Sequence, residues 1–508
     1  MSSEIHKHGP VGHLLEKARE YLTHWTVGGI IVALTGFAPD HWVAHLVENP
    51  HLPEWLTHDY RMGAVTLGVA IVVANIMVKT WWSATPEGAR PSASPEPLNK
   101  ADAAPIALNK KPSIAVLPFL NMSGDPEQDY FSDGISEDII TDLSKLSGVF
   151  VVGRQSSFIY KGKSIGLRQI GLELGVRFIL EGSVRRAGDR LRITTQLVEA
   201  EGNGQIWAER YDRKLEDIFA VQEEVARKVV DVLAVRLMPE ENDRLGHIPT
   251  QNLDAYESFK RGRTAVHPPT KENLAHGRKL FESTVALDPG FAGGYAGLSY
   301  IDSVSMTFGH VPRTPERLQQ AKTLAQKAIA LDPKFGWSQT VLAWAMWAGE
   351  AYDEAIAAAR RAVALQPGDA ETHGMLGLIL TFAGEANEAI SQTEQAIQLT
   401  PRGSGIYLNF FAYANAMAGN HETAITTLNQ IVPGAYSPVT YSMLILAYVE
   451  SGNIEEAKDM GELALKHYPQ LTTSSWIAVT LKRHDDMLRV AKALRTAGIP
   501  DQTLPQTD

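Results

Sequence analysis

Along the C-terminal half of the chain, small apolar residues recur at a nearly constant interval. Ala321, Ala355, Ala389, Ala424 and Ala457 are separated by 34, 34, 35 and 33 residues. Other apolar residues around them follow helical spacing, as do Tyr352, Ala355, Ile356, Ala359 and Val363. A unit of this length holds two short helices, which can bury their apolar faces only against neighbouring units. The pattern therefore predicts a solenoid of stacked helix pairs.

Further residues of each repeat recur at the same interval. A second small residue follows each alanine after seven positions, at Ala328, Ala362, Ala396 and Ala464, with Ile431 as the exception. Proline then ends the second helix of most pairs, at Pro333, Pro367, Pro401 and Pro469, because it cannot continue a helix. Pro433 comes early, so the second helix of that repeat is expected to be short. The wide gap between Pro289 and Pro333 predicts an insertion near residues 306–314.

The N-terminal part of the chain is apolar in a different way. Residues 63–82, GAVTLGVAIVVANIMVKTWW, are long enough as a helix to cross the roughly 30 Å hydrocarbon core of a bilayer. Residues 25–47 are also mainly apolar but are interrupted from Pro39 to His41, so both a crossing and an interfacial position are open, with a crossing favoured. Residues 1–82 are therefore expected to be a membrane anchor with spans at about 25–47 and 63–82.

The basic residues predict the orientation of this anchor. Lysine and arginine lie before the first span and after the second, whereas the loop between them carries only Arg61. With two spans, the positive-inside tendency places the C-terminal domains in the cytoplasm, at a bacterial inner membrane. With one span, the ends of the chain would lie on opposite sides, and a periplasmic solenoid stays open.

Between the anchor and the solenoid, the sequence predicts a linker and a small domain. Residues 83–112 are rich in proline and alanine, as in extended linkers. Residues 113–240 mix strand and helix periodicities, with strands expected at 113–119, 149–153, 178–186, 190–198 and 205–210 and helices from 134, at 169–175 and at 217–237. The expected fold class is thus multidomain: N-terminal transmembrane helices, a small α+β domain and a C-terminal α-solenoid over 250–495.

Two resemblances extend this interpretation. The small residues, turn glycines and terminal prolines of about 336–470 resemble the tetratricopeptide repeat. The segments IAVLPF, NMSGDPEQDYFSDGISEDIITDLSK, SSFIYKGK, LGVRFILEGSVRR and WAERYDRKLEDIFAVQEEVA resemble a domain related to the N-terminal part of TolB, over 113–237. In bacterial proteins that domain often precedes tetratricopeptide repeats, and many such proteins are labelled adenylate-cyclase-like. Since only apolar segments and a linker stand before residue 113, no cyclase catalytic domain is expected.

Composition narrows the chemistry. The chain has 508 residues, a net charge of −11 and no cysteine, which excludes disulfides, thiol catalysis and iron–sulfur clusters. No basic cluster is interleaved with aromatic residues, so no nucleic-acid partner is expected. His41 and His45 lie four residues apart and could hold a metal, haem or pigment, but interfacial histidines are the favoured interpretation. We therefore expect no cofactor and no metal.

The small domain offers few candidates for catalysis. Asp125, Asp133, Glu137 and Asp138 could form a metal site, but the favoured interpretation is that Asp133 caps a helix and Glu137 and Asp138 occupy its first turn. Gly153, Arg154, Ser156 and Ser157 could cradle an anion, although they match no phosphate loop. Arg185 and Arg186 are expected to form a solvated strand edge. No catalytic residue is expected, and the chain is not predicted to be an enzyme.

The predicted function is a membrane-anchored scaffold or assembly factor that binds protein partners on the solenoid. Candidate partner-binding residues, named from their repeat positions on first helices, are His373, Leu376, Tyr407, Asn409, Tyr413 and Tyr441. The lipid bilayer is a further expected partner, and self-association through the hairpin edge or the membrane helices is also expected. Two alternatives stay open: an accessory subunit of a membrane enzyme or redox complex, and an adenylate-cyclase-like signalling protein.

Overall fold

A computed structural model describes residues 111–125, 128–202, 204–247, 249–403, 405–431, 436–475 and 481–501. The chain divides into two compact units, Met1–Lys100 and Ala101–Asp508, and the described residues all belong to the second. Both predicted membrane spans, His41 and His45 lie outside the described residues, so these predictions are untested. Within the described ranges, no helix has the length and apolar character needed to cross a bilayer.

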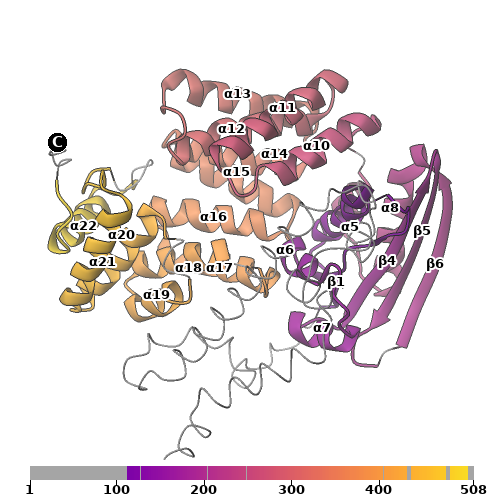
Figure 1. Ribbon diagram of the computed structural model, residues 1–508, viewed down its shortest axis with the longest axis horizontal. Helices are drawn as coiled ribbons and strands as arrows, with labels where there is room; N and C mark the ends of the chain where they lie inside the picture. Colours follow the sequence, from indigo (N-terminus) through magenta and orange to yellow (C-terminus); the bar gives the residue numbers. More distant parts are fainter. Residues whose placement is uncertain are drawn as a thin grey trace, which may run out of the picture. The chain divides into compact units, whose positions relative to one another are not determined.

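The first part of the described chain is a small α/β domain (Figure 1). Its elements are β1 (Ser113–Val116), β2 (Leu120–Asn121), α5 (Asp129–Ser144), β3 (Phe150–Val151), α6 (Arg154–Ser157), η3 (Phe158–Tyr160), α7 (Leu167–Leu174), β4 (Phe178–Ala187), β5 (Arg190–Glu199), β6 (Gly204–Lys214), η4 (Leu215–Asp217), α8 (Ile218–Val232) and α9 (Pro239–Arg244). The predicted hairpin is confirmed as β4 and β5, which meet at a turn where Gly188 has a φ of +63°. The predicted strands and the long final helix are present within a few residues of their expected bounds.

The sheet is mixed and has helices on both faces. The strands lie in the order β3-β1-β4-β5-β6, with β1 parallel to β3 and β4, and with β4, β5 and β6 antiparallel. One face packs on α5 and α8 around Ile139, Leu180 and Val229. The other face is covered by α7 only near β1 and the start of β4, through Ile170 and Leu174. The remaining half of this second face carries alternating polar residues.

The start of the first long helix was predicted wrongly. Helix α5 begins at Asp129, one turn before the expected position, so Asp133, Glu137 and Asp138 lie in its interior. Asp133 does not cap the helix: its carboxylate instead accepts a hydrogen bond from Lys161 Nζ at 2.8 Å. The residues that precede the predicted start are typical of a turn but are also compatible with the first turn of a helix.

The rest of the described chain is a solenoid of paired helices (Figure 1). The helices are α10 (Leu253–Ala265), α11 (Lys271–Leu287), α12 (Ala292–Thr307), α13 (Pro315–Leu331), α14 (Gly336–Ala348), α15 (Tyr352–Leu365), α16 (Ala370–Ala383), α17 (Ala386–Leu399), α18 (Gly405–Ala418), α19 (His421–Leu428), α20 (Pro438–Glu450), α21 (Ile454–His467) and α22 (His484–Thr496). Each helix packs on its sequence neighbour, and the first helices of successive pairs pack on one another. The C-terminal region is a tetratricopeptide-like solenoid.

The periodic alanines occupy the closest contacts between these helices. Ala321, Ala355, Ala389, Ala424 and Ala457 are all fully buried. The predicted short second helix is α19, with eight residues, and the predicted insertion is the loop between α12 and α13. The apolar period therefore predicted the regular repeats, and the proline positions predicted their two irregular members.

First and second helices of a pair differ in their surroundings. Second helices such as α15 are amphipathic and expose a polar face, whereas first helices such as α14 and α16 are apolar around nearly their whole circumference. A helix that is apolar on all sides must be covered on all sides. Accordingly, nearly every residue of α14 and α16 is buried.

Candidate functional site

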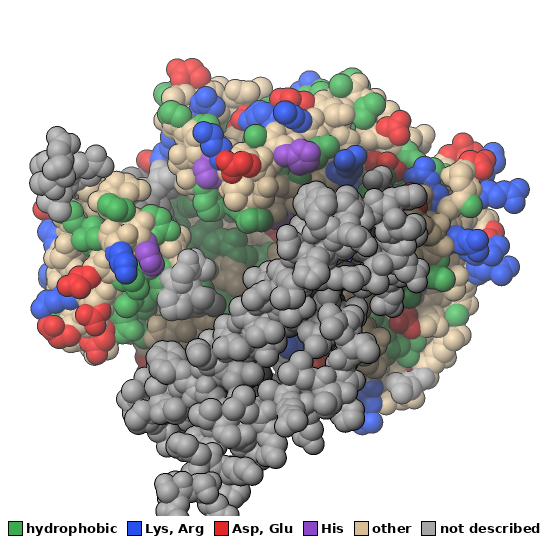
Figure 2. Space-filling model, in the orientation of Figure 1, with side chains coloured by type: hydrophobic (Ala, Val, Ile, Leu, Met, Phe, Trp, Pro, Cys, Tyr) green, Lys and Arg blue, Asp and Glu red, His purple; other side chains and the backbone are tan. Residues whose placement is uncertain are grey.

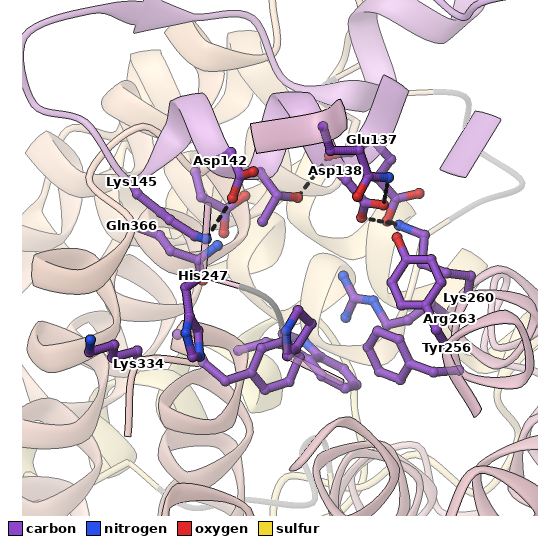
Figure 3. Close-up of a pocket in the computed structure, with 18 of the residues that line it drawn as sticks. Glu137, Asp138, Asp142, Lys145, His247, Tyr256, Lys260, Arg263, Lys334 and Gln366 are labelled. Atoms are coloured by element: carbon purple, nitrogen blue, oxygen red, sulfur yellow. Dashed lines mark hydrogen bonds and ion pairs between the residues drawn. The ribbon is translucent and has the colours of Figure 1, made fainter. Parts of the chain in front are cut away.

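A polar cavity of about 140 Å³ lies between the α/β domain and the solenoid (Figure 3). Helices α5 and α8 contribute one wall, and α10, the start of α14 and the turns before α14 and α16 contribute the other. Its charged and polar lining includes Glu137, Asp138, Asp142, Lys145, His247, Tyr256, Lys260, Arg263, Lys334 and Gln366. The cavity is therefore built by residues far apart in the sequence, and neither domain forms it alone.

Lys260 from the solenoid is the central cation of the cavity. Its Nζ lies 2.8 Å from Glu137 Oε1 and 3.2 Å from Asp138 Oδ1, and its side chain is only 10% exposed. Gln222 of α8 donates a hydrogen bond to the second oxygen of Asp138 at 2.8 Å. Figure 3 shows Lys260 reaching toward the two adjacent carboxylates of α5. One ammonium group thus joins the solenoid to two consecutive acidic residues of the other domain.

The two carboxylates do not share this cation equally. Burial alone would raise the pKa of Glu137, but the charges of Lys260 and Arg154 outweigh it and lower the pKa to about 2. Burial raises the pKa of Asp138 to about 7, against the attraction of Lys260 and with a further contribution from the charge of Glu137. Glu137 is therefore the permanent anion of the pair, and Asp138 is a carboxyl group that titrates near neutral pH.

A second charged group lies beside the first, within the solenoid. Arg263 of α10 forms an ion pair with Glu371 of α16 at 3.0 Å, and its guanidinium lies 4.1 Å from the centre of the Trp337 ring. The indole of Trp337 donates to Glu371 at 3.1 Å. Burial would raise the pKa of Glu371, but Arg263 keeps it below its usual value. Burial and the nearby Glu371 raise the pKa of Asp369, which caps α16.

The contact between the domains continues along three successive turns of the solenoid. These are the turns that contain Pro333, Pro367 and Pro401, each at the end of a second helix. The hydrogen bonds and ion pairs involved are Lys334–Asp243 at 2.6 Å, His247–Asp332 at 2.8 Å, Arg244–Ala364 at 2.6 Å, Gly368–Ser144 at 2.8 Å, Gly153–Leu399 at 2.7 Å and Arg402–Ser156 at 2.9 Å. We call this row of contacts, together with the cavity, the seam.

Two glycines allow the backbones to approach across the seam. A Cβ atom added at Gly368 would lie 3.1 Å from the Cα and 3.1 Å from the carbonyl oxygen of Ser144. One added at Gly153 would lie 3.2 Å from the carbonyl oxygen of Leu399. Both glycines donate their backbone N–H to that same partner residue. The seam is therefore a direct contact of main chains as well as of charged side chains.

The chemistry available in the cavity is that of a buried ion network. Its carboxylates are neutralised by Lys260, Arg263 and Lys145, the last bonded to Asp142 at 2.6 Å. The hydroxyl of Tyr256 is buried, and no bonding partner for it is found in the described part of the chain. Over the same ranges, no group of three or more histidine or acidic side chains is arranged to hold a metal ion. The network is suited to fixing two domains together, and Asp138 and Asp369 are its carboxyl groups with raised pKa.

The structure places the predicted partner-binding residues mainly inside the solenoid. His373, Leu376, Tyr407, Tyr413 and Tyr441 are buried, because the first helices that carry them are covered on nearly all sides. Several are hydrogen-bonded there, as Tyr413 is to Thr440 at 2.7 Å and Tyr441 to His467 at 2.8 Å. Asn409 is the member of the set that is partly exposed. Partner binding by these six residues stays a prediction.

The seam was not predicted from the sequence, although several of its residues were candidates for other roles. The proposed anion cradle instead contacts the solenoid: the N–H of Gly153 and the hydroxyl of Ser156 both bond to the turn around Pro401, and Arg154 pairs with Glu137 at 3.0 Å. Arg186 was wrongly assigned to a solvated edge, since it lies 3.5 Å from Glu257 of α10. One signal was present in the sequence: Glu137 and Asp138 are two adjacent acidic residues that flank the apolar stripe of their helix.

Comparison with known proteins finds a relative that matches part of this chain. A scan against protein-family models finds no match. The chain is 52% identical over 206 residues to a Rhizobium meliloti (strain 1021) protein named "Putative adenylate cyclase 3". The match covers 41% of this chain and 35% of that protein, so the chain spans well under half the length of this relative.

Solved structures similar to this one contain helical repeats. The Pseudomonas aeruginosa pilF protein has 15% sequence identity and a TM-score of 0.33, over 43% of this chain and 94% of its own. YrrB, described as a TPR protein with an unusual peptide-binding site, has 18% identity and a TM-score of 0.28, over 42% and 97%. The assignment of a tetratricopeptide-like solenoid rests on the helix pairing of this chain itself, not on these likenesses.

Proposed function

We propose that this chain is a membrane-anchored scaffold that binds protein partners through its solenoid. The supporting observation is the stack of helix pairs from α10 to α21, since such repeats contact only their neighbours and present a long surface to other molecules. In this proposal the α/β domain is related to the N-terminal part of TolB, the anchor lies at residues 1–82 in a bacterial inner membrane, and both described domains face the cytoplasm.

The first half of α18 is the best candidate for the binding surface. Ile406 is 48% exposed, and Asn409 and Phe410 follow at helical spacing on the same face, both partly exposed. The Asn409 side chain is held in place, because its Nδ2 donates to the Gly405 carbonyl at 3.1 Å and its Oδ1 accepts from Thr440 at 3.3 Å. An exposed apolar residue beside an oriented amide offers both the contact area and the hydrogen bonding that a protein interface uses.

Cross-linking and affinity capture of the full chain from solubilised membranes would test this proposal. We expect a stoichiometric protein partner that is lost in Ile406→Glu. Leu287→Glu is the matched control, since Leu287 is also an exposed apolar residue, 43% exposed, at the end of α11. The scaffold is refuted if the wild-type chain yields no stoichiometric partner, and the α18 surface alone is refuted if Ile406→Glu keeps it. Release of the chain from membranes by alkaline carbonate would contradict the anchor.

A second candidate function is suggested by the partial relative. Because the matched protein is named as an adenylate cyclase, we also consider a role in nucleotide signalling, with the matched region as a non-cyclising part. Calorimetric titration of the full chain with ATP and with cyclic AMP separates the two candidates. A scaffold gives no saturable binding of either nucleotide, whereas saturable binding would favour signalling.

A further inference from the structure

One half of a sheet face in the α/β domain is uncovered by any described element. Along β4, β5 and β6, Val184, Ile193 and Tyr211 point toward α5 and α8 and are buried. The residues that alternate with them point to the opposite face, where α7 covers only the region near β1. Figure 2 shows basic side chains gathered at the right-hand margin, where Figure 1 places these strands.

This open face is rich in basic side chains. Its cations are Arg185, Arg190, Arg192, Arg210 and Lys214, and all five are exposed. Asp212 pairs with Arg192 at 2.6 Å and with Arg210 at 3.1 Å, and Glu216 pairs with Lys214 at 3.2 Å. In the described part of the chain, the guanidinium groups of Arg185 and Arg190 have no ion pair. Asp217, which lines the same hollow, and Asp189 in the turn also lie near Lys214. The excess positive charge of the face therefore rests on Arg185 and Arg190, in a chain whose net charge is −11.

The strand register places like charges directly opposite each other. Arg185 is opposite Arg192, and Arg190 is opposite Lys214. Like charges at opposite positions of an antiparallel pair destabilise the sheet. Asp212, Asp217 and Asp189 offset part of this repulsion. An anionic surface laid on the face would neutralise the rest.

We propose that this face, Arg185, Arg190, Arg192, Arg210 and Lys214, docks on an anionic phospholipid bilayer. The domain directly follows the linker of residues 83–112, which at ~3.1 Å per residue reaches at most roughly 90 Å from the predicted span. Tethering makes docking an intramolecular event, so that weak attraction is sufficient. This step rests on the anchor of the proposed function. Nucleic acid fits less well, because these positions carry no aromatic side chain on which bases could stack.

The absence of cysteine from the chain allows a direct test. Thr194→Cys puts a single thiol on the basic face, where Thr194 is exposed and lies opposite Arg210. The full chain is labelled there with a fluorophore and placed in nanodiscs that contain quencher-bearing lipids. We expect quenching in discs that contain phosphatidylglycerol, decreasing with added salt, and none in phosphatidylcholine discs. Gln320→Cys, exposed on α13, is the control label and is expected to stay unquenched in both.

Charge-neutralising variants sharpen the result. In the Thr194→Cys background, Arg185→Gln with Arg190→Gln removes two cations without leaving an acidic partner unpaired. Since each basic side chain near an anionic surface contributes about fivefold, the docked-to-undocked ratio is expected to fall roughly 25-fold. Lys279→Gln with Arg317→Gln removes the same charge from exposed positions on the solenoid and is expected to leave the ratio unchanged.

Docking and anchoring fail in distinguishable ways. A chain that enters the discs but is unquenched in anionic lipid, or is quenched equally in both lipids, overturns the docking proposal. An equal effect of the two double variants overturns it as well. A chain that stays outside the discs overturns the anchor. In that case, the same labelled chains are titrated with anionic vesicles that carry the quencher, which tests docking directly. The absence of quenching in this titration refutes docking. Salt-sensitive binding of a single-stranded oligonucleotide with no lipid quenching would identify nucleic acid as the occupant instead.

Discussion

The interior of the solenoid and the seam hold the molecule together by opposite means. Inside the solenoid, fully buried alanines let helices approach closely, and the stabilisation comes from apolar contact between sequence neighbours. At the seam, Lys260, Arg244 and Lys334 bind acidic or carbonyl partners more than 85 residues away in the sequence. The first kind of contact repeats and tolerates variation, whereas the second depends on individual charges that are costly to leave unpaired.

The two kinds of contact differ in how much stability is lost when a mutation removes them. An apolar cavity or clash loses packing energy in proportion to its size. A buried ion whose partner is removed keeps its desolvation penalty and loses its compensation, which is why breaking such a pair costs more than the pair contributed. The seam should therefore respond to single charge changes more strongly than the solenoid responds to single changes of volume.

Removal of Lys260 is expected to have the largest effect. Lys260→Met leaves Asp138 without its cation and Glu137 with Arg154 as its remaining ion-pair partner. The change should destabilise the seam by about 3 kcal/mol. Hydrogen exchange at the Gly153 and Gly368 amides, which bond across the seam, measures the loss. Adding Glu137→Gln and Asp138→Asn should recover most of it. Lys458→Met, which breaks an exposed pair with Glu455, is the control and should leave these amides unchanged. An equal response of both lysine variants would contradict the comparison.

Overpacking the solenoid should cost somewhat less. Ala355→Leu inserts three carbon atoms into a fully buried helix contact and is expected to destabilise the repeats by about 2 kcal/mol. Ala357→Leu, two positions along the same helix and exposed, provides the matched control and should be nearly neutral. Urea unfolding followed by circular dichroism compares them. If Ala357→Leu proves as harmful as Ala355→Leu, the repeat alanines are not the close-contact points.

A methyl group at the backbone contact should have a smaller effect. Gly368→Ala pushes the turn around Pro367 away from Ser144 by a few tenths of an ångström, at an expected cost of about 1 kcal/mol. Exchange of the Gly153 amide, which bonds to the next turn of the solenoid at Leu399, reports whether the strain spreads along the seam. At Gly166 an added Cβ meets no atom within 4 Å, so Gly166→Ala serves as control. Unchanged exchange in Gly368→Ala would show that the turn adapts locally.

The last expected effect is a pH dependence confined to the seam. The folded pKa of Asp138, about 7, exceeds its ordinary value of 3.8, so its contribution is complete below pH 3.8 and is lost as the pH rises toward 7. The folded pKa of Glu137, about 2, is below its ordinary 4.5, so its contribution is present above pH 4.5 and is lost as the pH falls toward 2. Exchange protection of Gly368 should thus decline from about pH 4 to 7. In Asp138→Asn this decline should be absent; an unchanged slope would assign it to another group, such as Asp369.

The sequence predicted the solenoid far better than the seam, for a physical reason. Ala355 and Pro367 mark local events, a helix contact and a helix end, and such events repeat with the chain's own period. Lys260 and Glu137 are indistinguishable in sequence from solvated charges, because their partners are fixed only once both domains have folded. The same limit explains the assignment of Arg186 to solvent, whereas the misplaced start of α5 came from local turn residues that are also compatible with a first helical turn. Most of the predicted partner-binding residues are buried because the first helices that carry them are apolar on nearly all sides. Their positions within the repeat did not show this.

The three bonded turns have a mechanical consequence. A repeat stack behaves as a spring, because a small rotation between neighbouring units adds up along its length. The α/β domain binds the turns at Pro333, Pro367 and Pro401 simultaneously. Those repeats therefore cannot rotate against one another unless these hydrogen bonds and ion pairs break. Tension applied to either end of the solenoid would act on these held repeats as shear across the ion pairs of the seam. Elastic bending would be confined to the repeats that the α/β domain does not contact.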